Sequence, residues 1–129
     1  ISHCGDYAAA VVSKLNRVGV DIEVISEKVQ KLKDKFLNST EQEMIGKIYH
    51  HSDSVSRLQL LTLGWSIKET MFKWYGNGKI DFKEHLHIKD ISLHGNEFSA
   101  HCIISKNDTI ELKLHGLIFN NNFLTWLVT

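Results

Sequence analysis

The chain has 129 residues, enough for one domain with a modest core, and its 43% hydrophobic and 23% charged residues are ordinary for a globular protein. Its 15 Lys and Arg residues balance 15 Asp and Glu residues, and this zero net charge gives no electrostatic reason to expect nucleic acid or an anionic membrane surface as a partner. No apolar run is long enough to span a membrane, and two isolated cysteines, Cys4 and Cys102, favour reduced thiols in a cytoplasmic protein over a disulfide framework.

The first residues predict a polar loop, Ile1–Gly5, followed by a buried strand, Tyr7–Val12. Ser2 and His3 in this loop could donate hydrogen bonds to a phosphate, although side chains of this kind more often satisfy a turn. Both interpretations stay open at this point.

The second predicted strand, Val18–Ile25, alternates apolar and acidic residues. Successive side chains of a strand point to opposite faces, so we expect the apolar ones on the core face. These are Val20, Ile22 and Val24. Asp21 and Glu23 then share the other face, about 7 Å apart. Neighbouring carboxylates repel unless the face is wet or a cation lies between them, which leaves a solvated edge strand or a magnesium site.

Two helices are predicted next. Ser26–Phe36 is a polar, lysine-rich segment with helical spacing. Thr40 and Glu43 match a capping box, so a second helix should begin there and run to about His50. Glu41 lies in its first turn, where it suits the helix dipole and could alternatively be a base at the edge of a pocket.

The longest predicted helix runs from Ser54 to Gly76, with Ser52, Asp53 or Ser54 as its cap and Gly76-Asn77-Gly78 as its stop. Its apolar residues fall on two sides, which predicts a central helix that is covered both ways. One side carries Leu58, Leu61, Trp65 and Phe72. The other carries Leu60, Leu63, Ile67, Met71 and Trp74.

Charged residues on this central helix need a reason. Glu69 lies one turn from Lys73 and one turn from Trp65, and Lys68 precedes it. A carboxylate beside a large aromatic ring and two cations is a candidate site for a metal and a phosphate. The simpler alternative is an ion pair between Glu69 and Lys73 on the flank of the helix.

After Gly78 the pattern changes to the two-residue period of strands, separated by turns rich in glycine and asparagine. The predicted strands are Ile80–Phe82, His87–Leu93, Glu97–Ser105, Thr109–Leu117 and Phe123–Val128. Strands, then helices, then an antiparallel run of strands predict the α+β class.

Four segments carry a family resemblance when taken in order. Ile1-Ser2-His3-Cys4 resembles an Ile-Ser-His-Ser motif, and residues 19–23 resemble Gly-[Ile/Val]-Asp-[Ile/Val]-Glu. Phe36 followed by residues 39–41 resembles a Phe…Glu helix start, and residues 65–73 resemble Trp-[Ser/Thr]-x-Lys-Glu-[Ala/Ser]-x-x-Lys. Together these motifs are similar to those of the 4'-phosphopantetheinyl transferase superfamily, over about the first 80 residues.

The resemblance implies a 4'-phosphopantetheinyl transferase-like lobe, in which an antiparallel sheet packs against a long central helix, as a single domain over residues 1–129. It is to the two-lobed type of the family, whose Ser-His segment opens the second half. The chain would therefore be the C-terminal lobe of a longer enzyme, with the first lobe missing or replaced through self-association.

The resemblance further implies transfer of 4'-phosphopantetheine from coenzyme A to a serine of an acyl or peptidyl carrier protein, with Mg²⁺ as the cofactor. The implied ligands of Mg²⁺ are Asp21, Glu23 and Glu69. The implied contacts to coenzyme A are Ser2, His3, Lys68 and Lys73. The implied catalytic residues are Glu41, which would accept the serine proton, and Lys73, which would neutralise the leaving group.

Two other functions fit the same residues. Three carboxylates with lysines would also serve another magnesium-dependent enzyme acting on phosphate esters, such as a nuclease or phosphohydrolase. A lobe without catalytic activity could instead only bind a partner. Neutral net charge argues against a nuclease.

Overall fold

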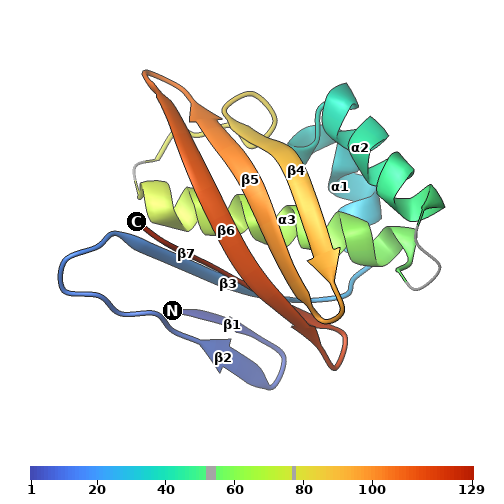
Figure 1. Ribbon diagram of the computed structural model, residues 1–129, viewed down its shortest axis with the longest axis horizontal. Coiled ribbons are helices and arrows are strands. Elements are labelled where there is room, and N and C mark those ends of the chain that lie inside the picture. The colour runs from blue at the N-terminus through green and yellow to red at the C-terminus, as the bar shows by residue number, and fades with distance from the viewer. Residues whose placement is uncertain (52–54, 77) are drawn as a thin grey trace.

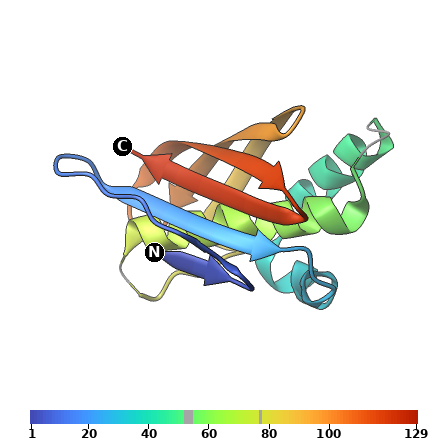
Figure 2. The same ribbon diagram turned by 90° about the horizontal axis from the view of Figure 1, so that it is seen from below.

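The computed structural model describes residues 1–51, 55–76 and 78–129. Over these residues the chain forms a five-stranded antiparallel sheet with helices packed on it and a separate two-stranded hairpin, which confirms the predicted α+β class (Figures 1 and 2). The elements in chain order are β1 Ser2–Cys4, β2 Tyr7–Ala9, β3 Val18–Val24, α1 Lys28–Phe36, α2 Ser39–His50, α3 Arg57–Tyr75, β4 Leu86–His94, β5 Glu97–Ser105, β6 Thr109–Phe119 and β7 Asn122–Val128.

The strand order of the large sheet is β3-β7-β6-β5-β4, so the chain's first long strand, β3, pairs with its last and forms an edge. Turn residues in the left-handed region connect the neighbours, with Gly95 at φ 62° between β4 and β5 and Asn120 and Asn121 at 46° and 62° between β6 and β7. Four of the five predicted C-terminal strands are present. The prediction of a strand at Ile80–Phe82 was wrong, because these residues lie in the connection before β4.

Helix α3 crosses one face of the sheet, as Figure 1 shows, and holds the core together. It begins three residues later than predicted, because Ser56 and Gln59 form a reciprocal capping box. Ser52, Asp53 and Ser54, the predicted caps, lie outside the described residues. The predicted end is confirmed, with Gly76 in the left-handed conformation at φ 75°.

Both apolar sides of α3 are covered, as the sequence predicts. One side packs into the main core with the sheet, and its residues Leu60, Leu63, Ile67 and Met71 are fully buried. On the other side the half-buried Trp65 ring contacts Phe36 of α1 and Phe82, with ring centroids 5.2 and 5.4 Å apart. No helix among the described residues is long and apolar enough to cross a membrane.

Helix α2 is capped by residues other than those predicted. The Asn38 side chain accepts a hydrogen bond from Glu41 N, and the Glu41 carboxylate accepts one from Asn38 N, at 2.8 and 2.9 Å. The prediction of Thr40 and Glu43 as the box was wrong by two residues, because Asn38-x-x-Glu41 satisfies the same spacing and starts the helix earlier. Glu41 is in the first turn, as predicted.

The N-terminal residues form a hairpin rather than a loop and a buried strand. β1 pairs with β2 across a turn at Gly5, whose φ is 57°. The predicted strand Tyr7–Val12 is shorter and largely exposed, and Val12 itself is 89% exposed. The hairpin lies along the open edge of β3 (Figure 2).

Strand β3 presents its acidic face, not its apolar face, to α3. A Cβ on Gly19 would lie 2.7 Å from Thr70 O, so the face that carries Gly19 and Asp21 is the one against the helix. Val20 and Ile22 are buried as predicted, but they lie outside the main core and Val20 lines a cavity with residues 8–11. The predicted orientation was therefore reversed.

Candidate functional site

The last turns of α3 and the middle of β3 bring together residues from distant parts of the sequence. Gly19 lacks a side chain, which lets the α3 backbone approach β3 closely. Two residues later Asp21 projects from the same face, and Lys73 projects toward it from α3. The hairpin along the edge of β3 adds Ser2 to this group. We call Ser2, Asp21 and Lys73, with the nearby Glu23 and Glu69, the acidic cluster.

Hydrogen bonds join three members of the acidic cluster. Lys73 Nζ donates to Asp21 Oδ1 at 2.8 Å and to Ser2 Oγ at 3.1 Å. Ser2 Oγ donates to Asp21 Oδ1 at 3.3 Å and accepts from the backbone N–H of Ile22 at 3.1 Å. The Asp21 side chain is 2% exposed and that of Lys73 is 35% exposed, so the carboxylate is buried while the lysine side chain is partly open to solvent.

The cluster has more negative charge than its single ammonium group can balance. Burial, together with the neighbouring Asp21 charge, raises the pKa of Glu23 to about 8. Burial and Asp21 also raise the pKa of Glu69, against the opposing effect of Lys73. The ion pair between Glu69 and Lys73, the simpler alternative for these residues, is not formed within the described ranges, and Lys73 pairs with Asp21 instead.

The charge and hydrogen bonding of the cluster fit a bound cation. Asp21 Oδ2 is buried and is the one buried side-chain oxygen or nitrogen of the described residues that has no hydrogen-bond partner. Carboxylate oxygens are the ligands that Mg²⁺ prefers. No three His, Cys, Asp or Glu side chains stand in metal-ligand geometry within the described ranges, so Glu23 and Glu69 would have to turn toward Asp21 to complete a site.

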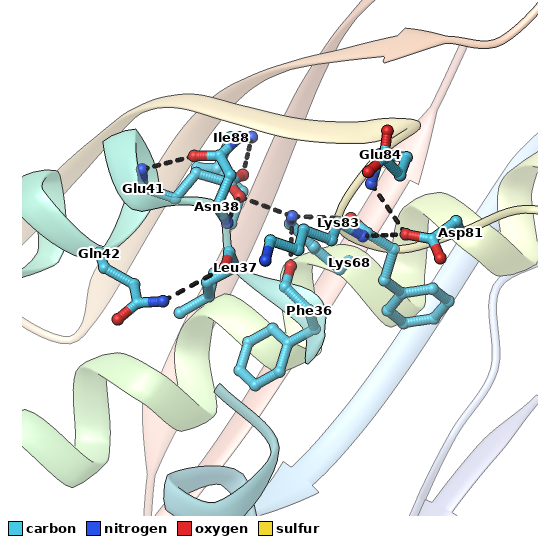
Figure 3. Close-up of polar contacts among 11 residues, drawn as sticks. Phe36, Leu37, Asn38, Glu41, Gln42, Lys68, Asp81, Lys83, Glu84 and Ile88 are labelled. Atoms are coloured by element: carbon cyan, nitrogen blue, oxygen red, sulfur yellow. Dashed lines mark hydrogen bonds and ion pairs between the residues drawn. The ribbon is translucent and has the colours of Figure 1, made fainter. Parts of the chain in front are cut away.

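Glu41 and Lys68 lie together in a second buried group (Figure 3). Their hydrogen bonds go to residues outside the acidic cluster. Lys68 Nζ donates to Glu41 Oε1 at 2.8 Å, to Phe36 O at 2.5 Å and to Phe82 O at 2.8 Å. These acceptors use all three N–H groups of the ammonium. Burial lowers the pKa of Lys68, and the Glu41 charge opposes that effect.

The Glu41 carboxylate is equally well satisfied. Oε1 accepts from Asn38 N and Lys68 Nζ, and Oε2 accepts from Ile88 N at 2.7 Å (Figure 3). The side chain is 2% exposed. This ion pair therefore joins the end of α1, the start of α2, the middle of α3 and the start of β4.

The remaining sequence-predicted site residue is His3, and Cys4 follows it in the same motif. The His3 side chain is exposed on β1 next to Ser2, and Cys4 is a half-buried free thiol. The structure thus brings Ser2, Asp21 and Lys73 into contact and sets Lys68 and Glu41 apart. Sequence reasoning missed the bond between Ser2 and Asp21, since the weak strand signal of residues 2–4 gave no sign that they lie beside β3.

Comparison with known families agrees with this arrangement of motifs. The model of the 4'-phosphopantetheinyl transferase superfamily matches residues 17–123, a range that includes Asp21, Glu41 and the segment from Trp65 to Lys73. Ser2 and His3 precede the matched range. A search of curated proteins finds no match to the chain. Because the family model covers most of its length, the chain belongs to the 4'-phosphopantetheinyl transferase superfamily.

Proposed function

We propose that the chain transfers the 4'-phosphopantetheine group of coenzyme A to a serine of an acyl or peptidyl carrier protein, with Mg²⁺ as the cofactor. Membership of the superfamily supports the transferase class. The observation that carries the proposal is the contact of Asp21 with Lys73, 52 residues apart in the sequence, beside Glu23 and Glu69. Buried carboxylates at a partly exposed lysine suit a magnesium diphosphate.

Asp21, Glu23 and Glu69 would hold the metal in this proposal. Mg²⁺ bound there would supply positive charge to the diphosphate of coenzyme A, and phosphoryl transfer depends chiefly on such charge neutralisation and on positioning. The unpartnered Asp21 Oδ2 and the raised pKa values of Glu23 and Glu69 support these ligands, because a bound cation would give Oδ2 a partner and would lower both pKa values.

Lys73 is the proposed electrostatic catalyst. The serine oxygen of the carrier forms a bond to the phosphorus next to pantetheine, and the bond from that phosphorus to the bridging oxygen breaks. Adenosine 3',5'-bisphosphate leaves with the electron pair, so negative charge grows on its side. The Lys73 side chain is 35% exposed and its ammonium group contacts Asp21, so in this proposal it would neutralise this charge.

The proton of the serine must go to a base. Glu41 is the residue that the family motif suggests, and this assignment stays a prediction. Its hydrogen bonding favours a structural role, since both carboxylate oxygens already accept from Asn38, Ile88 and Lys68. The hydrogen bonds of Lys68 likewise favour a structural role over a contact to phosphate. The His3 side chain is exposed and makes no hydrogen bond within the described part of the chain, so it stays a candidate contact to coenzyme A.

The test is a transfer assay with the whole chain, coenzyme A, Mg²⁺ and the apo forms of acyl and peptidyl carrier proteins. We expect the carrier to gain the mass of phosphopantetheine, and we expect EDTA to prevent that gain. Coenzyme A binding by calorimetry runs in parallel. Binding without transfer to any carrier would support a partner-binding lobe instead. Absence of both binding and transfer would contradict the proposal, and release of phosphate without a carrier would favour a phosphohydrolase.

A further inference from the structure

We propose that Ser2 is a positioning residue, whose hydroxyl group orients Asp21 so that Oδ2 is left for a divalent cation. This inference deepens the proposed function and rests on it. It differs from a contact between Ser2 and coenzyme A phosphate, which is the role that the motif suggests. The hydrogen bonds of the hydroxyl group decide between the two roles.

Every hydrogen-bonding position of the Ser2 hydroxyl is in use. A hydroxyl group has one proton to donate and two lone pairs to accept with. The lone pairs accept from Ile22 N at 3.1 Å and Lys73 Nζ at 3.1 Å, and the proton is directed to Asp21 Oδ1 at 3.3 Å. A phosphate oxygen would need that proton, so Ser2 cannot donate to Asp21 and to a phosphate at the same time.

The burial of Ser2 also supports a positioning role. Ser2 is 6% exposed, whereas its neighbour His3 is exposed on the same strand. Ser2 and His3 therefore face different surroundings, Ser2 the acidic cluster and His3 the solvent. Ser2 is therefore placed to contact Asp21 rather than a ligand in the solvent.

The Asp21 carboxylate is held in place by hydrogen bonds to one of its two oxygens. Ser2 and Lys73 both bond Oδ1, and Oδ2 has no partner among the described residues. Hydrogen bonds that orient a metal ligand through a neighbouring group typically change metal affinity by about 10-fold to 100-fold. Through Ser2, the β1–β2 hairpin becomes a support for the cation site, because the same hydroxyl group also binds the backbone of β3.

The test measures Mn²⁺, as a spectroscopic substitute for Mg²⁺, by electron paramagnetic resonance in the absence of coenzyme A. We expect Ser2→Ala to weaken Mn²⁺ binding by about 10-fold to 100-fold. Ser2→Thr, which keeps the hydroxyl group on a strand residue, should recover most of the affinity. His3→Ala is the matched control on the same strand and should bind Mn²⁺ as the wild type does. Thermal melting of each variant checks that it is folded.

A second measurement separates this inference from the phosphate role. Calorimetric titration with coenzyme A in the presence of EDTA should give the same affinity for the wild type and Ser2→Ala. Unchanged Mn²⁺ binding by Ser2→Ala, or a loss confined to coenzyme A affinity, would overturn the inference while the proposed function stands. A wild-type chain that binds no Mn²⁺ would instead remove the metal assignment of the proposed function, and the inference with it.

Discussion

Helix α3 takes part in two ion pairs of the same length, one fully buried and one partly open to solvent. Lys68 Nζ lies 2.8 Å from Glu41, and Lys73 Nζ lies 2.8 Å from Asp21. In the first pair every donor of Lys68 has an acceptor and both Glu41 oxygens have donors. In the second pair one Asp21 oxygen has no partner among the described residues, two further carboxylates lie close by, and the lysine is 35% exposed.

The comparison separates a structural ion pair from a candidate site. A buried pair with all its hydrogen bonds made has no capacity left for a ligand, and its loss leaves an uncompensated charge. A buried carboxylate with a free oxygen and surplus negative charge is stabilised by an added cation. Five residues along α3 turn the helix by roughly 140°, which places the two lysines on different sides.

The largest expected effect is on activity. We expect Asp21→Asn, Glu23→Gln and Glu69→Gln each to abolish magnesium-dependent transfer, with a fall of at least about 100-fold, the scale for loss of one electrostatic stabiliser. The mass gain of a carrier protein measures it. Glu43→Gln, a change at an exposed glutamate of α2, is the control and should transfer normally. Near-normal turnover by the Glu69 variant would refute its place in the site.

The next effect is on stability, and it falls on the other ion pair. Glu41→Ala should lower the free energy of unfolding by about 3–5 kcal/mol, because it leaves the Lys68 charge buried without its partner. Urea unfolding measures the change. Glu43→Ala removes an exposed pair with Lys47 at 3.9 Å and should cost about 0.3–0.5 kcal/mol. If the two variants lose similar stability, the structural role of Glu41 is wrong.

A smaller loss of stability is expected where β3 and α3, the two elements that carry Asp21 and Lys73, approach each other closely. Gly19→Ala places a Cβ 2.7 Å from Thr70 O, so α3 must move from β3 and we expect a loss of about 1–3 kcal/mol. Gly64→Ala is the contrasting variant, since its Cβ would meet only ordinary contacts at 3.7 Å and beyond. It should be neutral or stabilise α3 by up to about 1 kcal/mol. Equal losses in both would show that close approach at Gly19 is not required.

The last expected effect is a pH dependence of stability without metal. The pKa of Glu23 is about 8 in the folded chain and 4.5 ordinarily, so between these values the folded state holds the proton more tightly. The free energy of unfolding should therefore fall as pH rises from 4.5 to about 8. The difference between the pH profiles of the wild type and Glu23→Gln separates the contribution of Glu23 from that of the histidines, which titrate in both proteins. Parallel pH profiles for the two proteins would contradict it.

Much of the fold could be predicted from local patterns. The strand period after Gly78 and the two apolar sides of α3 follow from residues that are neighbours in sequence, and the structure has them. The N-terminal hairpin could not be predicted in this way, because the apolar run to Val12 looks buried unless its neighbours are known. Both faces of β3 are covered, so alternation alone could not tell which one meets α3. Gly19 was the signal, since only a residue without Cβ fits there.

Local patterns also predicted only part of the candidate site. Motif spacing identified Asp21, Glu69 and Lys73, and in the structure Lys73 donates a hydrogen bond to Asp21. The contacts of Ser2 and Glu41 depend on which distant backbone groups are left without partners, such as the N–H groups of Ile22 and Ile88. Those groups are known only when the strands have been paired.

The most direct test is a crystal of the chain soaked in Mn²⁺, with its anomalous scattering recorded. The expected result is a peak bonded to Asp21 Oδ2, with Glu69 turned toward it and the bonds between Glu41 and Lys68 unchanged. A peak at Glu41, or none near Asp21 in a crystal that holds Mn²⁺ elsewhere, would contradict the separation of the two ion pairs.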